Sequence, residues 1–96
     1  MNKWAYLFVY DDKVGTRDEI KAFLDSRPEI LNWAYCMPHS FFLVSNRTAS
    51  GIRELISSFN KNGGRFIIVD VKTDRDGWLP RSYWDWLSNP KGVNEK

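Results

Sequence analysis

Residues 4–24 read WAYLFVYDDKVGTRDEIKAFL, and this stretch decides the fold because it joins two different periodicities across one short loop. The segment Trp4–Tyr10 lacks Gly and Pro and is rich in aromatic and β-branched residues, which predicts a strand. Thr16 and Glu19 have the spacing of a capping box, and apolar residues then recur at intervals of three and four. The stretch therefore predicts a strand, a loop and a helix that ends before Pro28.

The residues that follow predict four further core elements and a glycine turn. Two strands are predicted at about residues 31–37 and 40–45, on either side of Pro38. A helix capped by Thr48 follows, with an apolar stripe at Ile52, Leu55, Ile56 and Phe59. A left-handed glycine turn at residues 62–64 then leads to a strand at residues 66–71. The order β-α-β-β-α-β predicts a ferredoxin-like α+β fold, in which an antiparallel sheet carries both helices on one face.

The 96 residues are enough for one domain. We expect its core at residues 3–72, a Trp-rich C-terminal extension at residues 73–90 whose short helix begins near Pro80, and a frayed tail at residues 91–96. The net charge is only +2 and no basic block occurs, which is evidence against a nucleic-acid-binding tail. A lone cysteine, Cys36, the lack of a signal-peptide pattern and the lack of a long apolar run predict a cytoplasmic protein without a membrane partner.

The first strand has two apolar faces, and their assignment determines which surface the fold leaves open. We expect the aliphatic set to face the helices and the aromatic set to lie on the open face of the sheet. The aromatic set is Trp4, Tyr6, Phe8 and Tyr10. A stable chain covers such a face, so we expect the extension, through Trp78 and Trp84, or a second copy of the chain to pack on it.

Two other uses of an aromatic sheet face stay open. Exposed rings stack on single-stranded nucleic acid in RNA-recognition modules, but residues 40–45, SFFLVS, have neither the glycine nor the basic residues of those modules. Rings also line small-molecule pockets, although the sequence shows no cofactor fingerprint.

The candidate chemical groups are few. Asp11 and Asp12 follow the first strand, where carboxylates can hold Mg²⁺ together with water; aspartates in this position also form turns. His39, at the expected hairpin tip, is a candidate general base, and Ser40 follows it without an evident activating partner. Basic side chains on or beside the helices are candidate phosphate contacts, namely Arg17, Lys21 and Arg47. Acidic residues interleaved with them weaken any positive field.

Three segments of the chain are similar to a known group of proteins. They are the strand end Tyr10-Asp11-Asp12, the pattern L-N-W-x6-S-F-F-L-V over residues 31–44, and the pattern W-x5-W-x-W-L over residues 78–87. In element order nearly the whole chain resembles the small CRISPR-associated protein two family, and more closely its SinR-like cousins.

The resemblance implies a ferredoxin-like homodimer whose two sheets pack together. It also implies that Asp11 corresponds to the metal-binding aspartate of those family members that are metal-dependent nucleases, and that Ser40 matches a family serine. Our leading expectation is a homodimer with a structural or interaction role. The alternatives are a Mg²⁺-dependent endonuclease acting on RNA or DNA through Asp11, and a non-catalytic binder of single-stranded nucleic acid.

Overall fold

The structure, a computed structural model, describes residues 3–35, 37–71 and 75–88. Its elements are β1 (Trp4–Tyr10), α1 (Arg17–Ser26), β2 (Ile30–Ala34), β3 (Ser40–Ser45), α2 (Ala49–Phe59), β4 (Phe66–Asp70) and α3 (Arg81–Ser88). The strands form one sheet in the order β2-β3-β1-β4, and every neighbouring pair is antiparallel. The ferredoxin-like α+β arrangement predicted from the element order is confirmed.

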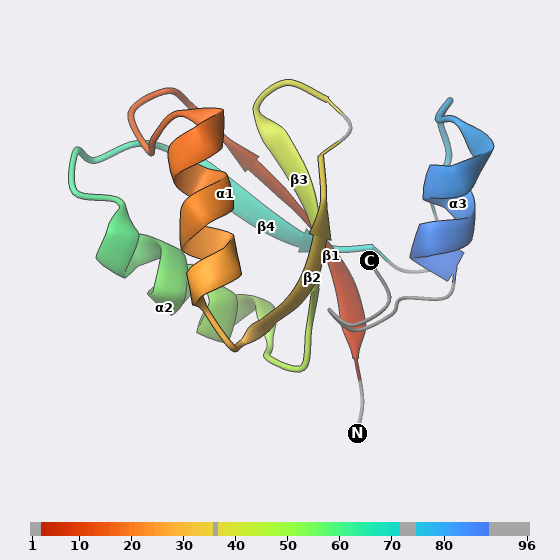
Figure 1. Ribbon diagram of the computed structural model, residues 1–96, viewed down its shortest axis with the longest axis horizontal. Coiled ribbons are helices and arrows are strands. Elements are labelled where there is room, and N and C mark those ends of the chain that lie inside the picture. Colours follow the sequence, from red (N-terminus) through yellow and green to blue (C-terminus); the bar gives the residue numbers. More distant parts are fainter. Residues whose placement is uncertain (1–2, 36, 72–74, 89–96) are drawn as a thin grey trace.

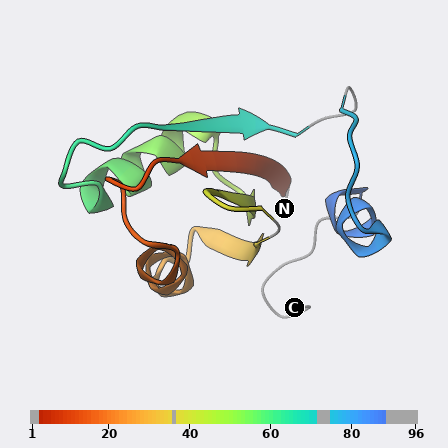
Figure 2. The same cartoon turned by 90° about the horizontal axis from the view of Figure 1, so that it is seen from above.

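The elements form three layers (Figures 1 and 2). Helices α1 and α2 lie on one side of the sheet and α3 lies on the other. Ile20 and Leu24 of α1 and Ile52 and Ile56 of α2 are buried against the sheet, as the apolar spacing of each helix predicts. Leu87 of α3 is buried in a second, smaller cluster on the opposite face.

Both long helices begin where the sequence predicts. The Thr16 hydroxyl accepts from the Glu19 amide at 3.2 Å, and the Glu19 carboxylate accepts from the Thr16 amide at 2.8 Å, which completes the capping box of α1. The Thr48 hydroxyl accepts from the Gly51 amide at 3.1 Å and caps α2. These signals act within four residues, so they can be read from sequence alone.

One predicted boundary needs correction. Strand β2 ends at Ala34, before the predicted end near residue 37, and its pairing with β3 shifts register between Ile30 and Asn32. Helix α2 ends at Phe59, the last residue of its predicted apolar stripe, and Gly63 has the left-handed φ of 69° predicted for the turn. The Asn60 side chain brackets this turn by bonding both the amide and the carbonyl of Gly64, at 2.9 and 2.8 Å. Cys36 and the expected frayed tail at residues 91–96 lie outside the described residues.

The predicted assignment of the sheet faces is wrong. Tyr6, Phe8 and Tyr10 lie in the main core beneath α1 and α2, where at most 6% of each residue is exposed. The pairing register explains this, because Phe8 lies opposite Phe41 on β3 and Ile68 on β4, and opposed residues share a face. Large rings fill the space between a sheet and two helices better than the aliphatic set does. Ala5 and its aliphatic neighbours therefore face α3.

Candidate functional site

The open face of the sheet is its side away from α1 and α2, and its strand residues carry no charge in the part of the chain that the structure describes. They include Ala5, Leu7 and Val9 of β1, Phe42 and Val44 of β3, and Ile67 and Val69 of β4. The C-terminal segment covers part of this face, since Ala5, Phe42 and Leu87 are buried together. Trp84 packs against the same cluster, whereas Trp78 is 85% exposed.

The C-terminal segment leaves one corner of the open face uncovered. Val9, Ile67 and Val69 are 38%, 58% and 45% exposed, and Val9 lies directly opposite Ile67 in the pairing of β1 with β4. We call these three residues the β4 corner. Val9 was predicted to face the helices, and Ile67 and Val69 were not predicted to be functional. Their alternation along residues 66–71 was the available signal, because Ile67, Val69 and Val71 form an apolar set whereas the other set ends in Asp70.

A cavity of about 380 Å³ lies where the C-terminal segment meets the sheet. Leu7, Phe42 and Val69 line its sheet side, and Trp78 and Trp84 line its other side. Its size falls within the range of about 300–1,000 Å³ typical of small-molecule sites. The chain thus has space for a ligand beside the β4 corner, and the lining is largely apolar.

The predicted metal residues Asp11 and Asp12 bind different partners. The Asp11 carboxylate accepts from the amides of Lys13 and Arg65, one at each oxygen and both at 3.0 Å. The Arg65 amide is the main reason that the pKa of the Asp11 carboxyl lies below its ordinary value. Asp11 therefore joins the end of β1 to the start of β4, which is the turn-forming role. Within the described residues no group of three or more His, Cys, Asp or Glu side chains could hold a metal ion.

Asp12 instead contacts His39, the candidate general base. Its Oδ1 lies 2.6 Å from His39 Nε2, and both side chains are at least half exposed. His39 has a left-handed φ of 60°, and its ring centroid lies 5.7 Å from that of Tyr10. Ser40 does not join this pair, because its hydroxyl donates to the carbonyl of Met37 at 3.1 Å. The arrangement orients an imidazole but does not activate the serine.

The three basic candidates do not form one surface. Arg17 and Lys21 of α1 lie over β2, with the Arg17 guanidinium carbon 5.1 Å and the Lys21 Nζ 5.5 Å from the ring centroid of Tyr35. Arg47 follows the C-terminal end of β3, whereas α1 begins after the C-terminal end of β1. Because β1 and β3 are antiparallel, Arg47 lies at the opposite end of the sheet from Arg17.

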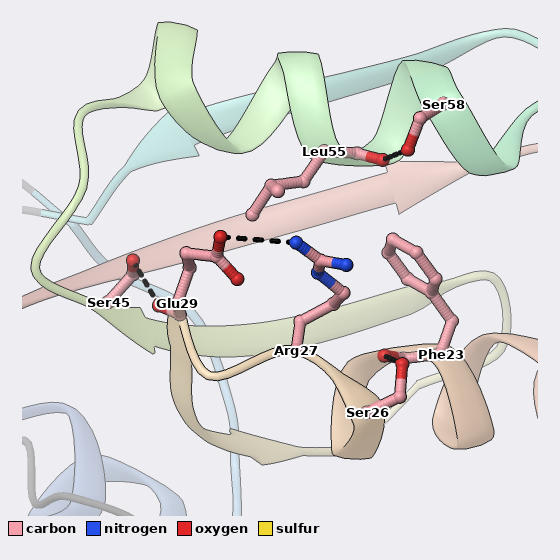
Figure 3. Close-up of polar contacts among 7 residues, drawn as sticks. All are labelled: Phe23, Ser26, Arg27, Glu29, Ser45, Leu55 and Ser58. Atoms are coloured by element: carbon pink, nitrogen blue, oxygen red, sulfur yellow. Dashed lines mark hydrogen bonds and ion pairs between the residues drawn. The ribbon is translucent and has the colours of Figure 1, made fainter.

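A polar contact in the turn after α1 has a structural role (Figure 3). Arg27 and Glu29 form an ion pair at 3.2 Å, and the Glu29 carbonyl accepts from the Ser45 hydroxyl at 2.7 Å. A main-chain amide and then Arg27 hold the pKa of the Glu29 carboxyl below its ordinary value. The contact joins the end of α1 to β3 and does not reach the open face.

Comparison with protein-family models, with curated proteins and with solved structures finds no match to this chain. The resemblance to the SinR-like group therefore stays a prediction. Among the described residues no helix combines the length and the apolar character needed to cross a membrane.

Proposed function

We propose that this protein is a homodimer with a structural or interaction role, and that two copies meet around the β4 corner. The observation that carries the proposal is the exposure of Val9, Ile67 and Val69 on an uncharged sheet face that the chain's own C-terminal segment only partly covers. Contiguous apolar surface of this kind marks association sites on small domains. Two identical patches related by a two-fold axis contact each other and close the assembly.

The chemistry of this face supports a protein partner over a nucleic acid. Binding of single strands needs rings on which bases stack and cations that follow the phosphates. Tyr6, Phe8 and Tyr10, three of the four rings predicted for that purpose, lie in the helix-covered core. The fourth, Trp4, is 38% exposed and lies beside Tyr6 and the start of α2, away from the open face. The β4 corner offers only aliphatic side chains, which suit another apolar protein surface.

The test is sedimentation velocity of the full chain from about 1 to 100 μM, a range that detects association of moderate strength. The wild-type protein is expected to sediment increasingly as a dimer. Ile67→Lys is expected to sediment as a monomer over the whole range, because it places a charge in the proposed contact. Ala22→Lys adds the same charge to an exposed position on α1 and is expected to dimerise normally. A wild-type monomer at the highest concentration would remove the proposal.

A further inference from the structure

Strand β4 is an edge strand with little of the usual protection against pairing, since Asp70 is its only charged side chain. It lies at the end of the sheet order, and within the described residues it pairs only with β1. Its sequence, FIIVD, has no Pro or Lys, and its pairing with β1 shows no bulge. The other edge strand, β2, carries a register shift. Figure 2 shows β4 at the outer side of the sheet. This edge therefore adjoins the β4 corner.

The main-chain bonds at the two ends of β4 show which residues direct their peptide groups outward. The Arg65 carbonyl accepts from the Asp11 amide and the Val71 amide donates to the Ala5 carbonyl, both at 3.0 Å. Odd-numbered residues of this strand thus direct their main-chain groups toward β1. Because successive residues of a strand alternate, Phe66, Ile68 and Asp70 direct theirs toward the free edge.

We propose that two copies of this chain pair their β4 strands in antiparallel register, with Ile68 opposite Ile68 of the second copy, and so form one continuous sheet. The inference rests on the proposed homodimer and names how its two chains meet. Ile68 is the midpoint of Phe66–Asp70, so a two-fold axis there overlaps the whole strand. In this register Phe66 opposes Asp70, and each opposed pair of outward residues exchanges two main-chain hydrogen bonds.

The side chains on both faces fit this register. On the open face Ile67 opposes Val69 of the second copy, which buries part of each β4 corner. On the helix face a groove of about 600 Å³ runs between α2 and β4. Ala49, Ser50 and Ser57 on its α2 side are small, which leaves room for the apolar side chains of an added strand.

Charge supports a second copy as the occupant of that groove. Arg53 of α2 lines the groove and is exposed. Asp70 lies opposite Tyr6 in the sheet and shares the helix face with it. The proposed register brings Asp70 of each copy into the groove of the other, on the same face as Arg53. Each chain therefore supplies both members of an opposite-charge contact.

Amide hydrogen exchange measured by NMR on the full chain tests the pairing. At a concentration where about nine in ten chains are dimeric, the Phe66 and Ile68 amides are expected to exchange about tenfold more slowly than in dilute solution, because only the unpaired tenth exchanges freely. The Ile67 and Val69 amides, which already face β1, serve as internal controls and are expected to change much less. A sedimenting dimer without this slowing would overturn the edge pairing and leave the homodimer intact. A monomer would overturn both.

A charge exchange across the proposed interface gives a second test. Arg53→Asp is expected to weaken dimerisation by about tenfold or less, as befits a partly exposed charge contact. Adding Asp70→Arg to that variant is expected to restore most of the loss, because the contact reforms with its signs exchanged. If the double variant dimerises no better than Arg53→Asp, the proposed register is wrong.

Discussion

At the scale of single residues, Gly64 is required by a close approach between two loops. A β-carbon added there would meet the Val14 amide nitrogen and would lie 2.6 Å from Val14 Cγ2. Gly64→Ala is therefore expected to destabilise the fold by about 1–3 kcal/mol through overpacking. Gly51→Ala, in α2, meets only ordinary contacts at 3.4 Å or more and is expected to stabilise by about 0.5–1 kcal/mol. Urea unfolding followed by tryptophan fluorescence measures both, and equal effects would contradict the crowding at Gly64.

The Asp11 carboxylate is expected to make stability depend on acid. Its pKa lies below the ordinary 3.8 in the folded state because main-chain amides donate to it, first among them that of Arg65. A group with a depressed pKa stabilises fully above its unfolded pKa and loses that contribution as the pH falls through its folded pKa. The wild-type urea midpoint should therefore fall as the pH is lowered below about 4.

The matching variant separates Asp11 from other carboxylates. Asp11→Asn is expected to be less stable than the wild type at pH 7 and to lose less stability on acidification, with Glu29 supplying part of the remaining loss. An unchanged acid profile would assign the effect to other groups. The partner of Asp11 could not be predicted, because Arg65 is 54 positions away in the chain.

At the scale of elements, local signals predict the segments and long-range pairing decides their faces. Thr16 and Thr48 mark helix starts through bonds that span three residues. Strand β1 offers no such signal for its orientation, because both of its faces are apolar along Trp4–Tyr10. Residues more than 30 positions away, such as Phe41 on β3, settle which face meets the helices.

The corrected faces predict a large difference between two adjacent residues. Phe8 is fully buried beneath the helices, so Phe8→Ala is expected to cost about 3–5 kcal/mol. Val9 is 38% exposed on the open face, so Val9→Ala is expected to cost less than about 1 kcal/mol in the dilute protein. Urea unfolding at low protein concentration makes the comparison. A larger loss for Val9→Ala would mean that the open face, and not the helix-covered face, holds the main core.

At the scale of the whole molecule, one small sheet has to be covered on two sides by a chain with limited surface to bury. Helices α1 and α2 cover one side completely enough to bury Phe8 and Phe41. On the other side α3 reaches Phe42 but leaves the β4 corner exposed. Two of the three residues of the β4 corner, Ile67 and Val69, lie on the edge strand β4 itself. In the proposed dimer, a second copy paired with β4 covers part of the corner and bonds the main-chain groups of the edge, and the fold of each chain stays the same.

Stability should therefore depend on protein concentration. Unfolding of a dimer releases two chains, so a tenfold increase in concentration adds about 1.4 kcal/mol to its free energy of unfolding. For two chains of 96 residues this raises Tm by about 3 °C. Calorimetry of the wild type and of Ile67→Lys at matched concentrations measures the effect. The variant is expected to melt at a Tm that does not change with concentration, because its chains unfold singly. Identical, concentration-independent curves for both proteins would show that the β4 corner contributes nothing across chains, and that the surface exposed on each monomer is compatible with a stable single chain.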